Sequence, residues 1–263
     1  MTRTTAQLAR QLRTDGVEGL QSSPASVFNG VVGPKRSVAW SRISLERVKV
    51  LKDDIGVSVN DVVLGLTGDV VRGYLERRDA LPERSLVAGV PVSTRAKGDK
   101  STGNQLSEMG ITWSTDIEDP LERVLAIHQA TTQAKGSGKA NKVNPLEAMA
   151  ESLIPGAMQL VFRAAAAAAD RISFPCNAVV SNVPMSPVPI YMAGARIEGV
   201  VPMSLLAPAQ GFNISVLSYC GELHFGVIAD PDLVDNVWEL ADAIPKALLR
   251  LEEAASADPC VAV

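Results

Sequence analysis

Histidine, the residue that most often moves protons in enzymes, is almost missing from this sequence. Its 263 residues include two, His128 and His224, which are not adjacent and stand in no HExxH or Ser/His/Asp pattern. The sequence therefore does not indicate a zinc protease or a serine hydrolase. His128 falls on the apolar side of a predicted helix, which favours a satisfied core or edge histidine. His224 alternates with Leu223 and Phe225, so we expect it to be an exposed strand residue pointing away from the core.

Cysteine is also scarce. The three copies, Cys176, Cys220 and Cys260, are odd in number and form no CxxC pair, so the sequence indicates neither a disulfide framework nor a metal site. No activating histidine or cation neighbours them in sequence, which favours structural thiols over nucleophiles. The phosphate-binding motifs GxGxxG and GxxxxGKS/T are missing too, and we expect no cofactor.

A surplus of basic charge and a long apolar run are missing as well. The formal net charge of −4 argues against nucleic acid as a partner. The opening residues lack the apolar core of a signal peptide. The most apolar stretch, Leu153–Ala169, contains Pro155 and Arg163 and is too short to cross a bilayer, so a plain buried helix is favoured over one resting on a membrane. We expect a cytoplasmic chain that is not secreted and has no transmembrane helix.

The strongest positive signal is the stretch Val57–Leu75, whose apolar residues recur at helical spacing. Ser58 and Asp61 are placed to form a capping box at its start. Three glycines lie inside it: Gly65, Gly68 and Gly73. Because each glycine costs a helix about 1 kcal/mol relative to alanine, we expect another element or a ligand to approach this helix closely.

The rest of the chain alternates between strand and helix patterns. Strands are predicted over 36–44, 85–93, 105–115, 177–183, 195–202, 212–219 and 222–229, with a tight turn at Cys220-Gly221. Further helices are predicted over 45–52, from residue 119, over 145–172 and over 233–253. These signals predict an α/β fold in which a mixed β-sheet packs against long helices. Residues 1–27 are expected to form a linker or arm, residues 28–254 one lobe, and residues 255–263 a flexible tail.

Five stretches, taken in order, resemble the C-terminal half of the bacterial wax ester synthase/diacylglycerol acyltransferase family. They are FNGVVGPKRSVAW (28–40), VSVNDVVLG (57–65), VPVSTR (90–95) followed by Gly103-Asn104, AVVSNVP (178–184) and GFNISVLSYCGELHFGVIAD (211–230). No single stretch is decisive, whereas the ordered set is specific.

The resemblance implies a CoA-dependent acyltransferase-like lobe, similar to those of condensation domains and chloramphenicol acetyltransferase, in which two related lobes enclose a channel. It implies transfer of an acyl group from acyl-CoA, as a substrate, to diacylglycerol, giving triacylglycerol, or to a long-chain alcohol, giving a wax ester. The family's general base is the second histidine of an HHxxxDG motif in its N-terminal lobe, and this sequence has no adjacent histidines. We therefore expect no catalytic residue here, a need for a His-bearing N-terminal lobe, and peripheral contact with a membrane or lipid droplet.

Carried over by position, the resemblance marks eight residues of a substrate channel or lobe interface: Asn60, Asp61, Arg95, Asn104, Ser181, Asn182, Asn213 and Ser215. Asn60 and Asp61 match the family's ND pair, although they suit the organisation of a helix start equally well. Arg95 could bind CoA phosphates or pair with an acid across the lobe interface. The four strand residues could line the channel or orient an oxyanion, or they could make strand-end hydrogen bonds. The family's Gly-Pro after Pro184 is replaced by Met185-Ser186, so the selectivity for acyl chain or acceptor is left open.

Two hypotheses of function follow. The chain is either the C-terminal lobe of a lipid O-acyltransferase, inactive alone, or a non-catalytic lipid-binding or regulatory module that kept the fold. The first predicts a large exposed apolar surface where the other lobe docks, and hence self-association or binding to lipid surfaces.

Overall fold

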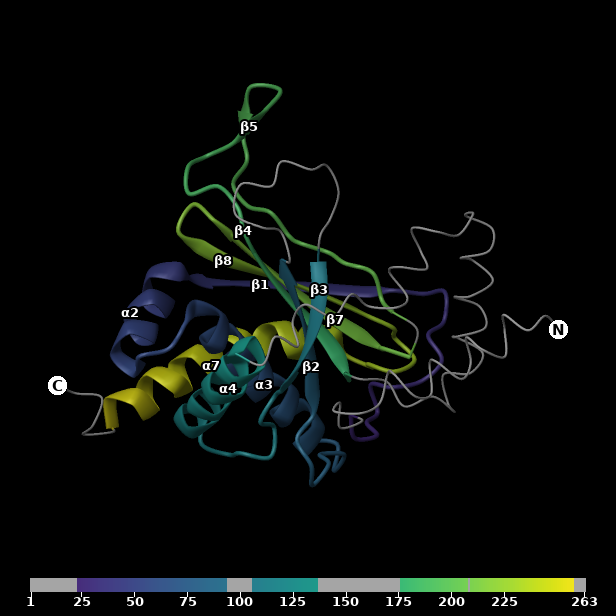
Figure 1. Cartoon of the computed structure of the whole chain (residues 1–263). Helices are drawn as coiled ribbons and strands as arrows, with labels where there is room; N and C mark the ends of the chain where they lie inside the picture. The colour runs from purple at the N-terminus through teal and green to yellow at the C-terminus, as the bar shows by residue number, and fades with distance from the viewer. Residues whose placement is uncertain (1–22, 94–105, 137–175, 208, 258–263) are drawn as a thin grey trace, which may run out of the picture.

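The computed structural model describes residues 23–93, 106–136, 176–207 and 209–257. Its main feature is a six-stranded sheet with the order β1-β8-β7-β4-β2-β3 (Figure 1). The strands are β1 (Ser37–Ser44), β2 (Val87–Ser93), β3 (Leu106–Thr112), β4 (Ala178–Pro184), β7 (Phe212–Tyr219) and β8 (Glu222–Ala229). The β2–β4 and β4–β7 pairs are parallel and the others antiparallel, so the mixed sheet predicted from the sequence is confirmed.

Four helices cover one face of this sheet, which we call the helix face (Figure 1). They are α2 (Leu45–Ile55), α3 (Val59–Glu76), α4 (Pro120–Gly136) and α7 (Val237–Ala257). Alternate residues of the strands point into the apolar core beneath them, as Phe212, Ile214 and Val216 do from β7. None of the helices in the described ranges is long and apolar enough to span a membrane.

Helix α3 lies at the centre of the helix layer and packs against both α4 and α7. The predicted capping box is present: Ser58 Oγ accepts the backbone N–H of Asp61, and Asp61 Oδ2 accepts that of Ser58. The expected close approach is confirmed at two of its glycines. A Cβ atom at Gly65 would overlap the side chain of Val124 on α4, and one at Gly68 would lie 2.9 Å from the carbonyl oxygen of Trp113.

Predicted and observed elements agree best at the C-terminal hairpin. Strands β7 and β8 have the predicted bounds, and the turn residues Cys220 and Gly221 have φ values of 48° and 84°, as a tight hairpin turn requires. Helix α7 starts at Val237, four residues later than predicted, because Leu233 and Val234 donate to the carbonyl of Asp230 in a turn. The helix predicted over 145–172 lies outside the described residues.

The strand predicted over residues 195–202 is wrong. Ala195–Arg196 is a two-residue strand, β6, which pairs with β5 (Tyr191–Met192) at the tip of a hairpin that projects from the sheet (Figure 1). We call residues 185–197 the arm. The Tyr219 hydroxyl closes its base by accepting the N–H of Ile190 at 2.9 Å and donating to the carbonyl of Ile197 at 2.7 Å.

Residues 198–207, which we call the strap, run back from the arm without helix or strand. They cross the face of the sheet opposite the helices, which we call the strap face. A Cβ atom at Gly226 of β8 would fall on the carbonyl oxygen of Pro202, and one at Gly199 would lie 3.1 Å from Cε1 of His224. His224 does point away from the helix face, but its predicted exposure is wrong, because the strap buries it.

Candidate functional site

Three of the eight predicted site residues come together on the strap face. Ser181 of β4 and Ser215 of β7 are partners in the parallel ladder, and Asn213 lies two residues before Ser215 on the same face. Ser215 Oγ donates to Asn213 Oδ1 at 3.0 Å. Asn213 and Ser215 are buried and Ser181 is half-buried. These short hydroxyl and amide groups can donate and accept hydrogen bonds toward a polar group of a bound molecule.

The other predicted residues lie elsewhere. Asn182 follows Ser181 along β4 and therefore points to the helix face, as its ladder partner Val216 does. Asn60 and Asp61 lie at the start of α3, also on the helix side of the sheet. Arg95 and Asn104 lie outside the described residues. The structure thus brings Ser181, Asn213 and Ser215 together and separates them from the start of α3.

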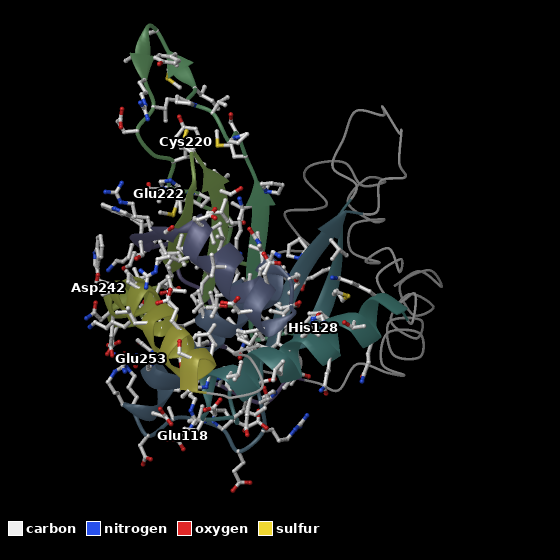
Figure 2. All side chains as sticks on the ribbon, turned by 90° about the vertical axis from the view of Figure 1, so that its left-hand side faces the viewer. Glu118, His128, Cys220, Glu222, Asp242 and Glu253 are labelled. Atoms are coloured by element: carbon white, nitrogen blue, oxygen red, sulfur yellow. The ribbon has the colours of Figure 1, made fainter. Side chains whose placement is uncertain are left out.

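Asp61 is the centre of a second polar cluster. Its carboxylate, 1% exposed, accepts hydrogen bonds from four donors. Oδ2 accepts from Ser58 Oγ at 2.7 Å and the Ser58 N–H at 3.0 Å, and lies 2.9 Å from His128 Nδ1. Oδ1 accepts from Thr131 Oγ1 at 2.8 Å. The cluster joins the start of α3 to α4, where Figure 2 places His128.

The protonation state of Asp61 follows from these contacts. Burial favours the neutral acid, but the hydrogen bonds from His128, Ser58 and Thr131 together outweigh it and lower the pKa of Asp61 below its usual value. The carboxylate is therefore ionised at neutral pH and fixes the orientation of the imidazole. His128 is the edge histidine that the sequence predicts. Its pairing with Asp61, which is 67 residues away, has no signal in the sequence.

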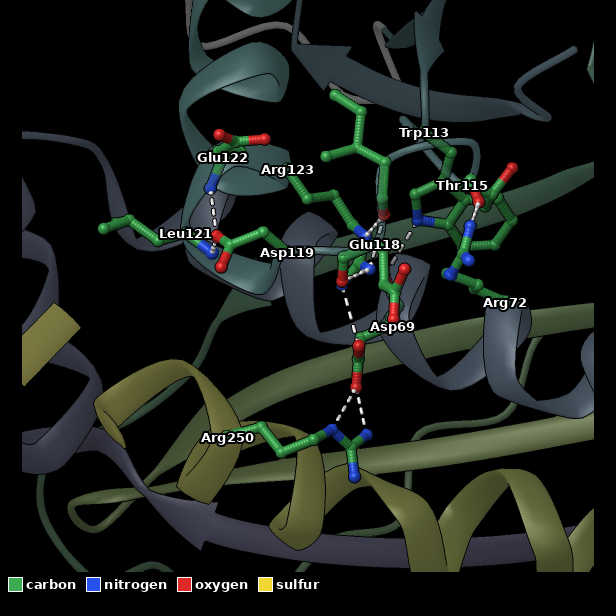
Figure 3. Close-up of polar contacts among 12 residues, drawn as sticks. Asp69, Arg72, Trp113, Thr115, Glu118, Asp119, Leu121, Glu122, Arg123 and Arg250 are labelled. Atoms are coloured by element: carbon green, nitrogen blue, oxygen red, sulfur yellow. Dashed lines mark hydrogen bonds and ion pairs between the residues drawn. The ribbon is translucent and has the colours of Figure 1, made fainter. Parts of the chain in front are cut away.

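A third polar cluster joins α3, α4 and α7 around Asp69 of α3 (Figure 3). Its Oδ1 accepts from the buried guanidinium of Arg123 on α4 at 2.8 Å, and its Oδ2 accepts from Arg250 of α7. Arg123 also donates to the carbonyls of Ile117 and Glu118. Every Arg123 contact is internal to the protein, so we assign this cluster to holding the helices together.

The described cysteines, Cys176 and Cys220, are free thiols. Cys176 is buried, donates to Glu108 at 3.0 Å and accepts from Gln210 at 2.9 Å. Burial, followed by the nearby Glu108 carboxylate, raises the pKa of the Cys176 thiol, so the reactive thiolate is disfavoured. Among the described residues, no group of three or more His, Cys, Asp or Glu side chains is placed to hold a metal ion.

Exposed apolar side chains concentrate on the arm and strap. Among the described residues, eight of the sixteen large exposed apolar side chains lie between positions 183 and 205, and Leu205 is 87% exposed. The eight are Val183, Met185, Val188, Tyr191, Met192, Val201, Met203 and Leu205. Figure 2 shows the arm standing clear of the sheet, beyond Cys220 and Glu222. An apolar concentration of this kind is typical of a surface that another molecule covers.

The six-stranded mixed sheet with helices on one face defines the class of protein. It is the fold of the condensation-domain-like acyltransferases. The epimerization domain of tyrocidine synthetase B superposes with a TM-score of 0.54 at 12% identity, over 95% of this chain and 56% of that one. A wax ester synthase/diacylglycerol acyltransferase from Marinobacter aquaeolei superposes with a TM-score of 0.73 at 27% identity, over 97% of this chain and 58% of that one.

The sequence gives the family. Residues 102–252 match the WS/DGAT C-terminal domain, and residues 1–63 match the wax ester synthase/diacylglycerol acyltransferase catalytic domain. The chain therefore belongs to the wax ester synthase/diacylglycerol acyltransferase family, as its motifs predict.

Two relatives from Mycobacterium tuberculosis carry names that give diacylglycerol O-acyltransferase as an unproven activity. They are 34% and 33% identical over 242 and 235 residues, which cover 90% and 89% of this chain. The matches cover 47% and 51% of the relatives, so the chain spans about half their length.

Proposed function

We propose that this chain is the acceptor-side lobe of a lipid O-acyltransferase, which transfers an acyl group from acyl-CoA to diacylglycerol or to a long-chain alcohol. The observation that carries the proposal is the match of residues 102–252 to the family's C-terminal domain. The superposition on the Marinobacter enzyme over nearly the whole chain supports it.

The strap face is the part of the lobe that we assign to substrate. Ser181, Asn213 and Ser215 combine hydroxyl and amide groups at one place on the strap face. Such groups can orient the acceptor hydroxyl or stabilise the oxygen of the carbonyl under attack. Their hydroxyl and amide groups are too weakly basic to take its proton, so we assign that step to a separate general base.

The general base would come from a His-bearing lobe of the HHxxxDG type, in the same polypeptide or a separate one. The arm and strap supply the surface to which we assign its docking. Their exposed methionines, Tyr191 and Leu205 are side chains that interfaces commonly bury. The same surface accounts for the peripheral lipid contact that we propose for the free chain, because an uncovered apolar arm can insert into a lipid surface.

The test is reconstitution. The chain is co-expressed with the His-bearing half of a relative, and triacylglycerol formation from acyl-CoA and diacylglycerol is measured, with a long-chain alcohol as the second acceptor. We expect the pair to copurify and to turn over, and each half alone to be inactive. An inactive but copurifying pair, beside an active intact relative, would contradict the proposal.

A matched pair of variants separates docking from folding. Replacing Val188 and Met192 of the arm by serine should abolish copurification. Val50 of α2 and Leu249 of α7 are also exposed, at 54% and 50%, and their replacement by serine should leave copurification intact.

The alternative function is a non-catalytic lipid-binding or regulatory module. It is favoured by the two non-adjacent histidines and by the full use of the Asp61 carboxylate in internal hydrogen bonds. It predicts acyl-CoA or liposome binding by the chain alone, with no turnover in the reconstituted pair.

A further inference from the structure

The imidazole of His224 is buried without a full set of partners. Its side chain is 6% exposed, and Nε2 is the one buried side-chain nitrogen or oxygen in the described part of the chain that lacks a hydrogen-bond partner. Burying such a nitrogen costs free energy, because it loses its hydrogen bond to water and forms none within the protein. The burial of His224 therefore depends on the segment that covers it, which is the strap.

The strap is that cover. Gly199 lies over Cε1 and Nδ1 of His224, and Pro202 crosses Gly226 two residues further along β8. Gly226 is the ladder partner of Ser215, so the strap also lies beside the predicted substrate residue. On its other side His224 faces Tyr219, with ring centroids 6.2 Å apart. The His224 imidazole thus contacts both the strap and Tyr219, which closes the base of the arm.

The charges around His224 come from several elements. Glu222 of β8 is nearest, with Oε2 3.7 Å from Nε2, and it also pairs with Arg42 of β1 at 3.5 Å. At the junction of arm and strap, Arg196 and Glu198 pair with each other at 3.4 Å. Burial lowers the pKa of His224; Glu222 opposes this and Arg42 adds to it. The closed strap therefore contains a neutral imidazole.

We propose that His224 is a proton-operated latch for the strap: the neutral imidazole lets the strap close over the sheet, and protonation releases it. A buried imidazolium would need Glu222, which stands beyond hydrogen-bond distance and is shared with Arg42. Release exposes the imidazole to water and uncovers Ser215 and Gly226.

The strap can open without unfolding the sheet beneath it. Residues 198–207 form no helix or strand, whereas β7 and β8 pair along their whole length. Segments of this kind open at lower free energy than the ladder that supports them. The arm stays closed at its base when the strap opens, because the Tyr219 hydroxyl bonds to both Ile190 and Ile197. The latch requires no acyl transfer, so it stands apart from the proposed function.

The direction of the pH response follows from linkage. A histidine with a lowered pKa in the closed state binds its proton better in the open state, so acid favours opening. The opening equilibrium should rise by about tenfold for each pH unit between the ordinary histidine pKa, about 6.5, and the lower value in the closed state. Above about pH 6.5 the response should vanish.

The experiment is amide hydrogen exchange of the whole chain between about pH 7.5 and pH 5, corrected for the intrinsic pH dependence of exchange. We expect protection of residues 198–207 to fall with acid while that of β7 and β8 stays constant. His224→Gln should remove the response, and His128→Gln, which changes the other histidine, should keep it. Unchanged strap protection in the wild-type chain, or a response that survives His224→Gln, would overturn the latch.

A second measurement does not depend on how His224→Gln folds. In the His128→Gln chain, His224 is the sole histidine, so one imidazole proton resonance can be followed through the titration. The latch predicts a midpoint below the ordinary histidine value. A midpoint at or above that value would mean that the closed strap accepts the cation, and the proposal would fail.

Discussion

The two faces of the sheet are built by different means. The helix face is sealed by four helices and an apolar core to which every main strand contributes. The strap face is polar at Ser181, Asn213, Ser215 and His224, and is crossed by the irregular strap. Adjacent residues of β7 alternate between these environments, so one strand serves both.

Because of this difference, the helix face provides most of the stability of the fold, whereas the cover of the strap face can change. Removing apolar surface from water stabilises the helix face in proportion to the area buried. On the strap face, Gly199 of the strap approaches the His224 ring, and the Pro202 carbonyl approaches Gly226 of β8. We therefore expect substitutions on the helix face to unfold the protein, and those on the strap face to change what the sheet exposes.

The largest difference in stability between the two faces should appear when neighbouring residues of β7 are replaced. Phe212 packs against Phe28 with ring centroids 4.6 Å apart, and Phe212→Ala should lower the free energy of unfolding by about 3–5 kcal/mol. Asn213→Ala, on the strap face, removes one hydrogen bond with Ser215 and should cost about 1 kcal/mol. Urea denaturation of both variants checks this. Equal losses of unfolding free energy in the two variants would show that the two faces contribute alike to stability.

The next effect concerns the cluster around Asp69. Asp69→Asn leaves the buried Arg123 guanidinium without its counter-charge and should cost about 3 kcal/mol (Figure 3). Arg250→Gln removes the exposed partner of the same carboxylate and should cost no more than about 1 kcal/mol. Thermal unfolding of the two variants gives the comparison. A larger loss in Arg250→Gln would show that the exposed pair matters more than burial predicts.

Asp61→Ala should cost about 1–2 kcal/mol at neutral pH, because the start of α3 loses half its capping box and α4 loses the link through His128 and Thr131. The pKa of Asp61 is lowered in the folded protein, so its stabilisation is complete above its unfolded value of about 3.9 and is lost as pH falls below it. The difference between wild type and variant should therefore shrink in acid. A constant difference across that range would assign the effect to packing.

The smallest effect on global stability should come from Gly226→Ala. The added Cβ meets the carbonyl oxygen of Pro202, so the strap must move while β7 and β8 stay paired. Exchange protection should fall in residues 198–207 and remain in the sheet. Cooperative loss of protection in both would show that strap and sheet open together.

The helix face could be predicted because its signals are local. Apolar periodicity gives α3 and β7–β8 almost residue by residue, and Ser58 with Asp61 gives the helix start. Strand alternation also implies that Ser181 and Asn182 face opposite ways, although the resemblance groups them in one site.

The strap face could not be predicted because its contacts are long-range. Nothing near His224 in sequence indicates that Gly199 will cover it. The pattern of residues 195–202 suggests a strand, although within it the structure forms a strand at Ala195 and Arg196 alone. The link between Asp61 and His128 has the same origin: it depends on how α3 and α4 pack.

The closed base of the arm has one further consequence. Ile197 donates to the carbonyl of Ile190 at 2.9 Å, and the Tyr219 hydroxyl bonds to both residues, so the chain leaves the sheet and returns at the same point. A segment whose ends already meet can change length without shifting the strands that carry it. The arm is thus an exchangeable module: hairpins from relatives could be grafted between Ile190 and Ile197, and partner choice could diverge while the register of β4, β7 and β8 stays fixed.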